Sequence, residues 1–189
     1  LEKINVNRSD AELLGILFSY VPKIAEAKQL DSLLVLIADL GRELVLAERC
    51  SLWLVSSDKK ELWTKVAHGC DEIRIPITAG FVGYSYANNE PLLIEDAYND
   101  SRFDSSVDKN SGYRTKAVLT VPFKNSVGEV MGVFQAINKV GGTQFSKDDL
   151  KFLQLTAVYS AKSLESAMLF QELERTQEEI TLILGAAAE

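Results

Sequence analysis

The sequence predicts an α+β fold, in which helices pack on a central antiparallel β-sheet and a long helix follows at the C-terminus. Two observations support this prediction. Apolar residues recur at helical spacing near both ends of the chain, and with a period of two in between. The period-two segments are joined by short turns, which is typical of antiparallel hairpins.

Two helices are predicted before the sheet. Ser9 and Glu12 have the spacing of a capping box, and apolar residues then recur at helical spacing. Pro22 has no amide hydrogen, so we expect it to kink or split this first helix. A second helix is expected from about residue 31 to about residue 46, because its leucines and isoleucine form one apolar stripe.

Six strands are predicted, at residues 50–55, 62–67, 72–77, 91–94, 116–124 and 130–138. The first two and the last two strands are expected to form hairpins, because short turns at residues 56–60 and 125–128 join them. A short helix entered through Gly80 is expected at residues 80–88, and a polar, irregular segment with one short helix at residues 98–115.

The C-terminal part is expected to form one long helix. Residues 147–184 contain neither proline nor glycine, which allows a helix of roughly 55 Å at 1.5 Å per residue. Steps of four and three residues give it a short a/d seam, formed by Leu169, Leu173, Thr176, Ile180 and Ile183. A free apolar stripe requires a partner, and a parallel homodimer through the terminal helices would supply one. The alternative is an ordinary amphipathic helix packed on its own sheet.

Composition argues against several classes of protein. The net charge is −7 and the 20 Lys and Arg residues are scattered, so no nucleic-acid partner is expected. No apolar run approaches the roughly 20 residues of a membrane span. Cys50 and Cys70 form no disulfide framework, which favours a reducing cytoplasm. With His68 as the single histidine, we predict no catalytic residue and no metal site.

Short motifs between residues 48 and 152 carry a family resemblance. They are Arg49–Leu52, Ile73–Pro76, Gly80–Gly83, Asp96–Tyr98 with Arg102 and Phe103, Val107–Asp108 with Gly112–Thr115, and Asn138–Lys139 with Phe145 and Asp149. With the order of the elements, they resemble a GAF domain of the type found in cyclic-nucleotide phosphodiesterases and cyanobacterial adenylyl cyclases.

The resemblance implies a structural motif beside a ligand pocket. Asn138, Lys139, Phe145 and Asp149 would hold the shape of the pocket, with Lys139 and Asp149 paired. The glutamate that closes this motif in the family is replaced here by Leu150.

The pocket itself has a physical argument. A helix entered through Gly80 is expected to leave the amides of Phe81, Val82 and Gly83 unpaired, with the positive end of the helix dipole behind them. Such a turn binds anions without Lys or Arg. The resemblance would place a cyclic phosphate there.

The resemblance also implies further ligand-binding positions, at Ser51, Phe103, Asp108, Ser111, Thr115 and Gln135. A structural alternative stays open for this site. Gly80 and Gly83 would then only permit close packing of the helix on the sheet, and Asp108 and Ser111 would cap a short helix.

Departures from the family pattern leave the ligand open. Ala67 and His68 replace an aromatic–acidic pair beside the base, and Asp104 stands where a tyrosine helps to hold the phosphate. A carboxylate there would repel the phosphate. The expected ligand is therefore cyclic AMP, cyclic GMP, another small molecule or none, and no cofactor is required. A bilin is disfavoured because the loop has no Cys–His pair.

The expected function is allosteric sensing. Ligand would close the loop at residues 96–115, and the shift would reach the 147–184 helix through residues 138–149 and bias an output domain. Residues 1–30 would be an N-terminal dimerisation or linker helix, 31–165 the GAF domain, and 166–189 a coiled-coil linker. The segment from Leu173 to Glu189 resembles the helix that leads into HD-GYP phosphodiesterases, which degrade cyclic di-GMP.

Two alternatives belong to other functional classes. One is a dimerisation module that binds no ligand. The other is a GAF-type enzyme that reduces methionine sulfoxide, which would need reactive cysteines in the pocket.

Overall fold

The computed structural model describes residues 8–65, 72–105, 108–109, 112–141 and 144–186. The predicted α+β fold is confirmed. In chain order the elements are α1 (Asp10–Glu26), α2 (Leu30–Leu44), β1 (Ala47–Val55), β2 (Glu61–Lys65), β3 (Glu72–Pro76), α3 (Gly80–Asn88), β4 (Leu92–Ile94), η1 (Ala97–Asn99), β5 (Val118–Lys124), β6 (Val130–Lys139) and α5 (Lys147–Ala186).

The six strands form one sheet in the order β3-β2-β1-β6-β5-β4, and all neighbours are antiparallel. Both expected hairpins, β1–β2 and β5–β6, are confirmed. The centre of the sheet is the pair β1 and β6, which no short turn connects. Their register brings Ser51 opposite Gln135, and this pairing assembles the candidate site.

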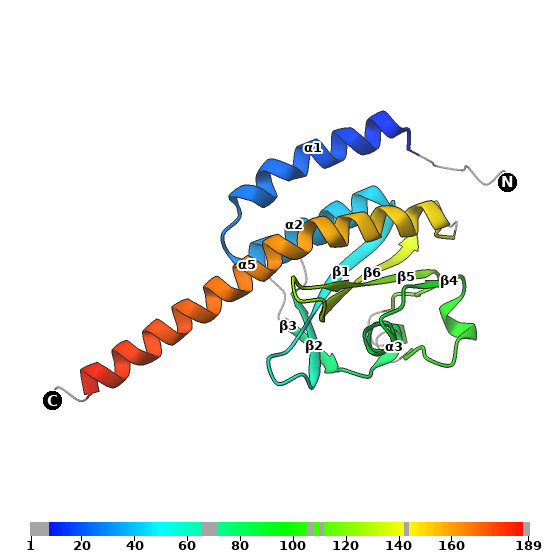
Figure 1. The fold of residues 1–189 in the computed structure, drawn as a ribbon. Helices are drawn as coiled ribbons and strands as arrows, with labels where there is room; N and C mark the ends of the chain where they lie inside the picture. The colour runs from blue at the N-terminus through cyan, green and yellow to red at the C-terminus, as the bar shows by residue number, and fades with distance from the viewer. Residues whose placement is uncertain (1–7, 66–71, 106–107, 110–111, 142–143, 187–189) are drawn as a thin grey trace.

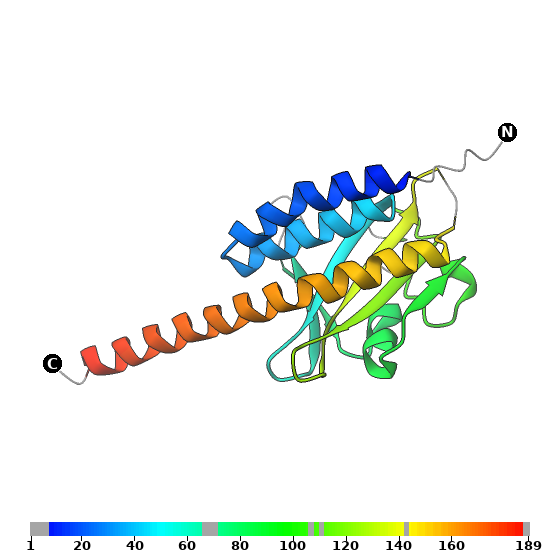
Figure 2. The ribbon, with the colours of Figure 1, turned by 45° about the horizontal axis from the view of Figure 1, so that its top comes forward.

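The two faces of the sheet carry different layers (Figure 1). Helices α1, α2 and α5 lie on one side, and α3 lies on the other (Figures 1 and 2). Side chains alternate along β1, so Leu52 and Leu54 enter the main core with α2 and α5, whereas Trp53 packs beneath α3. The main core is the larger one, so the face with α3 is left for a smaller and more polar interior.

The first helix forms as one piece. Its capping box is confirmed, because the Ser9 hydroxyl accepts from the Glu12 amide at 3.3 Å and the Glu12 carboxylate accepts from the Ser9 amide at 2.8 Å. The expected split at Pro22 is wrong, since α1 continues to Glu26. Pro22 lies near the end of the helix, where it removes one hydrogen bond, and Ile24 beyond it is still buried.

The last helix, α5, is a single helix of 40 residues, as expected. Its first part packs on α2 and β5, with Leu153 and Leu164 fully buried. Beyond Ala167 no side chain of the described helix is buried, and the helix projects from the domain (Figure 1). The seam residues Leu169 and Ile183 are both more than half exposed. Among the described helices, none combines the length and the apolar composition needed to cross a bilayer.

Candidate functional site

The first turn of α3 is the centre of the predicted site. Ala79 is its N-cap and makes no side-chain hydrogen bond to the helix. The Gly83 amide donates to the Ala79 carbonyl at 2.9 Å, so the expectation that this amide is free is wrong: it closes the first helical turn. The free amides at this end are those of Gly80, Phe81 and Val82, which bond to no described group.

At both glycines of this turn, the backbone disfavours a larger residue. Gly80 has φ of +59°, in the left-handed region that side chains disfavour. At Gly83, an added Cβ would lie 2.4 Å from the backbone carbon of Thr78. Gly83 therefore permits close packing, but against the chain that leads into the helix and not, as the structural alternative had it, against the sheet.

The side chains of this turn close it onto the sheet. Phe81 is buried and stacks on Phe103, with 5.9 Å between ring centroids, and Phe103 contacts Tyr98 at 5.0 Å. Val82 packs with Trp53 and other residues of a second apolar cluster. The described state is thus a closed one, with protein side chains beneath the free amides.

A row of polar residues crosses the sheet on the same side as α3. Ser51 lies opposite Gln135, and Gln135 lies opposite Thr120, on the three neighbouring strands β1, β6 and β5. The Trp53 indole donates to the Gln135 side-chain oxygen at 3.1 Å. Thr120 is completely buried, and its hydroxyl has no hydrogen-bond partner among the described residues.

Ser51 and Gln135 were predicted from the sequence, whereas Thr120 was not. The available signal was a hydroxyl residue in the middle of an otherwise apolar strand, which is typical of a strand buried on both faces.

The loop residues Asp108 and Thr115 are brought together and satisfy each other. Asp108 is buried; its carboxylate accepts from the Thr115 amide at 2.6 Å, from the Thr115 hydroxyl at 2.8 Å and from the Tyr98 hydroxyl at 3.1 Å. Desolvation and the hydrogen bond to Asp108 raise the pKa of the Tyr98 hydroxyl. The predicted Ser111 lies outside the described residues.

The structural motif lies at the start of α5. The Lys139 ammonium is 2.7 and 2.6 Å from the two carboxylate oxygens of Asp149, both side chains are buried, and Phe145 is buried beside the main core. Asn138 has a left-handed backbone, and its amide group bonds to the Lys116 amide, the Arg114 carbonyl and the Tyr113 hydroxyl. The motif therefore joins the end of the polar loop to the first turn of α5.

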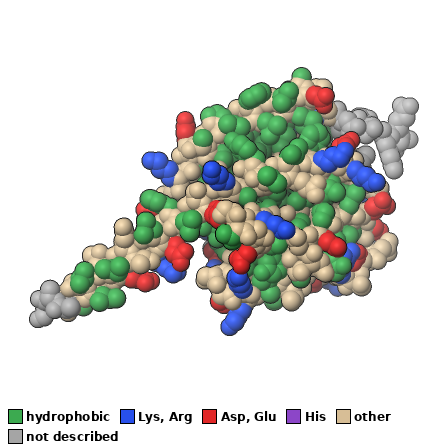
Figure 3. Space-filling view, viewed as in Figure 1, with side chains coloured by type: hydrophobic (Ala, Val, Ile, Leu, Met, Phe, Trp, Pro, Cys, Tyr) green, Lys and Arg blue, Asp and Glu red, His purple; other side chains and the backbone are tan. Residues whose placement is uncertain are grey.

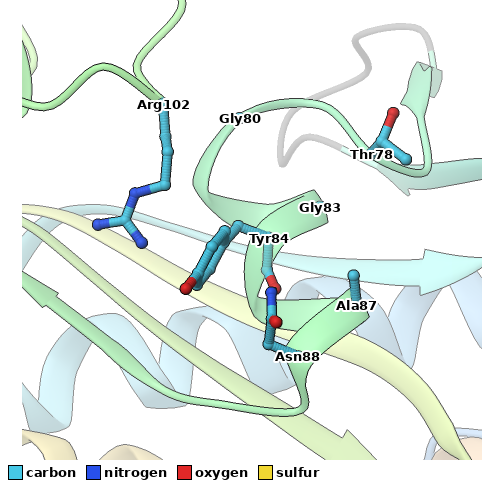
Figure 4. A pocket seen from close by; sticks show the side chains of 7 residues that line it. All are labelled: Thr78, Gly80, Gly83, Tyr84, Ala87, Asn88 and Arg102. Carbon is cyan, nitrogen blue, oxygen red and sulfur yellow. The ribbon is translucent and has the colours of Figure 1, made fainter.

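A shallow depression of 260 Å³ lies on the outer side of α3 (Figure 4). It is lined by Thr78, Gly80, Gly83, Tyr84, Ala87, Asn88 and Arg102. The Arg102 guanidinium lies 4.4 Å from the centre of the Tyr84 ring and pairs with Asp100, whose pKa it lowers to about 2. Of the predicted ligand-binding residues, Gly80 alone lines this depression, so it is not the predicted site.

The cysteine that the structure describes is far from the α3 side. Cys50 packs against the main core with α2, and burial raises its pKa to about 12. Cys70, His68 and Ala67 lie outside the described residues. Within the described ranges, no three or more His, Cys, Asp or Glu residues gather in a way that would hold a metal ion.

Comparison with known proteins gives concordant results. A family model described as GAF domain matches residues 29–164. The chain is similar to the dual 3′,5′-cyclic-AMP and -GMP phosphodiesterase 11A of Takifugu rubripes, with 38% identity over 138 residues that make up 66% of this chain. It spans 15% of that relative.

Solved structures resemble the fold. One is the GAF domain of a phosphoenolpyruvate-protein phosphotransferase from Coxiella burnetii, with a TM-score of 0.73, 20% identity, and coverage of 87% of this chain and 99% of the other. Another is the free methionine-R-sulfoxide reductase of Neisseria meningitidis, with a TM-score of 0.67, 19% identity, and coverage of 89% and 99%. At such identities the likeness establishes the fold alone.

Proposed function

The chain belongs to the GAF family, and from this premise we propose that it is a non-catalytic regulatory domain that binds a cyclic nucleotide between α3 and the sheet. The observation that carries the proposal is the set of three free amides at Gly80, Phe81 and Val82. Unpaired amides at the positive end of a helix favour an anion such as a cyclic phosphate. The similar segment of an enzyme that acts on cyclic AMP and cyclic GMP supports this class of ligand.

Binding requires the described closed state to open. Phe81 and Phe103 stack beneath the free amides, and Asp108 holds Thr115 and Tyr98. A nucleotide would displace the aromatic stack, take over hydrogen bonds of Asp108 and Thr115, and contact Ser51 on β1. Because Phe103, Asp108 and Thr115 belong to the segment that follows α3, ligand binding and rearrangement of that segment become one event.

The rearrangement has a short route to α5. The loop ends at Tyr113 and Arg114, which bond to Asn138, and the next residue, Lys139, pairs with Asp149 in the first turn of α5. A change in loop position thus bears on the start of the long helix. Coupling of this kind is typically worth about 1–3 kcal/mol.

The partner that we propose for α5 is a second copy of the chain in parallel. The apolar residues of the seam are each more than half exposed, and α1 adds exposed Leu14 and Phe18. Hydrophobic side chains are visible along the projecting helix (Figure 3). A paired helix covers both seams and can pass a rotation or a change in crossing angle to a following domain. The proposed target is an HD-GYP phosphodiesterase domain, to which residues 166–189 would lead.

The experiment is a thermal-unfolding titration of the chain with cyclic AMP and cyclic GMP, with 5′-AMP as the non-cyclic control. Ligand at 100 times its dissociation constant stabilises the folded state by about 2.7 kcal/mol. We expect one cyclic nucleotide to raise the unfolding temperature and 5′-AMP to leave it unchanged. No shift with either cyclic nucleotide at millimolar concentration would contradict the proposal.

A second candidate function is a dimerisation module that binds no ligand. Its specific support is the closed interior, where Phe81 and Val82 are almost completely buried and Asp108 already accepts three hydrogen bonds. A dimer of wild-type stability that responds to no cyclic nucleotide would favour this candidate.

The reductase alternative finds no support at Cys50. A reactive cysteine is a thiolate in the pocket, whereas Cys50 lies on the opposite side of the sheet from α3 and its pKa is raised. We therefore expect Cys50→Ala together with Cys70→Ala to leave the nucleotide response unchanged.

A further inference from the structure

Thr120 occupies a distinctive place on β5. Its side chain points to the α3 side of the sheet and has no exposed surface. One apolar cluster, with Phe81, contains Leu92, which lies opposite Thr120 on β4. Another cluster, with Val82, contains Trp53. The Trp53 indole bonds to Gln135, which lies opposite Thr120 on β6. Thr120 therefore lies on the α3 side of the sheet, between a strand neighbour in the Phe81 cluster and a strand neighbour bonded to the Val82 cluster.

The hydroxyl of Thr120 differs from those of the other buried threonines. Thr115 donates to Asp108 at 2.8 Å, Thr156 donates to the Phe152 carbonyl at 2.8 Å, and Thr64 reaches the Lys65 carbonyl at 3.5 Å. The Thr120 hydroxyl bonds to no group that the structure describes. A buried polar group without a partner destabilises the folded state, and in native proteins it calls for an explanation such as a ligand or a functional strain.

Two other described side chains have a buried polar atom without a partner, and neither lies near α3. Ser160 belongs to α5, on the other side of the sheet, and Arg8 precedes α1. Thr120 is thus the one of these three that lies on the α3 side of the sheet, where the candidate ligand site is.

We propose that Thr120 is a ligand-contacting residue, and that its hydroxyl forms a hydrogen bond with a polar heteroatom of the bound nucleotide at the floor of the site. This inference rests on the proposed function and adds a residue that neither the motifs nor the family resemblance named. In the closed state the same hydroxyl is left without a partner, so it destabilises that state relative to the open, ligand-bound one. The Thr120 hydroxyl then favours binding in two ways: it forms a hydrogen bond with the ligand, and it lowers the stability of the closed state that competes with binding.

The isosteric variant Thr120→Val separates this role from a structural one. Valine fills the same space without a polar atom, so it should raise the unfolding temperature of the ligand-free chain and weaken nucleotide binding. A loss of affinity of about tenfold corresponds to one lost hydrogen bond. Thr120→Ser keeps the hydroxyl and should bind the nucleotide with nearly wild-type affinity.

Thr156→Val is the matched control. Thr156 is also a buried threonine, but it lies on α5 and its hydroxyl is paired. We expect this variant to lower the unfolding temperature and to leave nucleotide affinity unchanged, which is the pattern of a purely structural threonine.

The experiment measures the unfolding temperature of each protein alone and its affinity for cyclic AMP and cyclic GMP by calorimetry. A Thr120→Val chain that is less stable than wild type, or that binds the responding nucleotide as wild type does, overturns the inference and leaves the proposed function standing. A wild-type chain that binds neither nucleotide overturns both.

Discussion

Lys139 and Asp149 form a buried ion pair, in which the ammonium lies 2.7 and 2.6 Å from the two carboxylate oxygens and each side chain is less than one-tenth exposed. Asp149 also accepts from the Ser146 amide at 2.6 Å, so the pair anchors the first turn of α5 to the end of β6. We expect Asp149→Asn to destabilise the fold by about 3–5 kcal/mol, because it leaves a buried ammonium unpaired. Urea denaturation measures this loss.

The control for this pair is the adjacent exposed one. Lys151 and Asp148 lie 3.3 Å apart with side chains that are about three-quarters exposed. Exposed pairs contribute little, so Asp148→Asn should change the free energy of unfolding by less than about 0.5 kcal/mol. Equal losses in the two variants would show that burial of the pair is not what makes it important.

Asn138 combines a left-handed backbone, with φ of 53°, and a side chain that bonds to three groups of the polar loop. Asn138→Gly keeps the backbone conformation and removes the side-chain bonds. Asn138→Ala removes the bonds and adds a backbone penalty of about 1–2 kcal/mol. We therefore expect the alanine variant to be the less stable one in urea denaturation, which reverses the usual order of Ala and Gly in a strand. The usual order would contradict the described backbone.

Gly83 is the point at which the chain before α3 passes closest to the helix. An added Cβ would lie 2.4 Å from the Thr78 carbon and 2.7 Å from the Ile77 carbonyl oxygen, and both are backbone atoms. We expect Gly83→Ala to cost at least about 2 kcal/mol and to weaken any ligand held by the first turn. Gly15→Ala is the control, because nothing lies within 4 Å of its added Cβ in α1 and alanine there should stabilise by up to about 1 kcal/mol.

Local sequence signals predicted the elements well. The capping box at Ser9, the turn between β5 and β6 and the helix entered through Gly80 depend on residues within a few positions of one another, and all are present. The split at Pro22 was wrong because tertiary packing of α1 on α2 overrides the loss of one hydrogen bond near a helix end.

The interior of the candidate site was harder to predict, because it depends on contacts between distant residues. The residues next to Phe81 in the sequence do not indicate that it stacks on Phe103. Likewise, the residues next to Asp108 do not indicate that its carboxylate accepts hydrogen bonds from Thr115 and Tyr98. The unpaired hydroxyl of Thr120 follows only from the register of β5 in the sheet and from what covers it, since an alternating pattern gives the direction of a side chain but not its partners.

The pair of Asp100 and Arg102 makes the stability of the fold depend on pH. The Arg102 guanidinium donates to Asp100 and lowers the pKa of its carboxyl from 3.8 to about 2. Because the pKa is lower in the folded state, the pair stabilises the fold fully at pH values above the pKa of the unfolded chain. This contribution is lost as the pH falls through the pKa of the folded state. We expect the stability difference between wild type and Asp100→Asn to be largest above about pH 4 and to vanish toward about pH 2. Urea denaturation over this range measures it, and a difference that does not change with pH would contradict the assignment.

The seam on α5 gives the most direct prediction about assembly. Leu173 occupies an a/d position of the repeat, whereas Leu182 lies off the seam, and both are more than half exposed on the projecting helix. A buried aspartate in a paired seam is costly, so Leu173→Asp should convert a dimer to a monomer in sedimentation equilibrium. Leu182→Asp should leave the dimer intact, since the same change in charge and volume falls on the outer side of the helix pair. A wild-type chain that sediments as a monomer, or two variants that behave alike, would mean that the apolar stripe is covered by something other than a second α5.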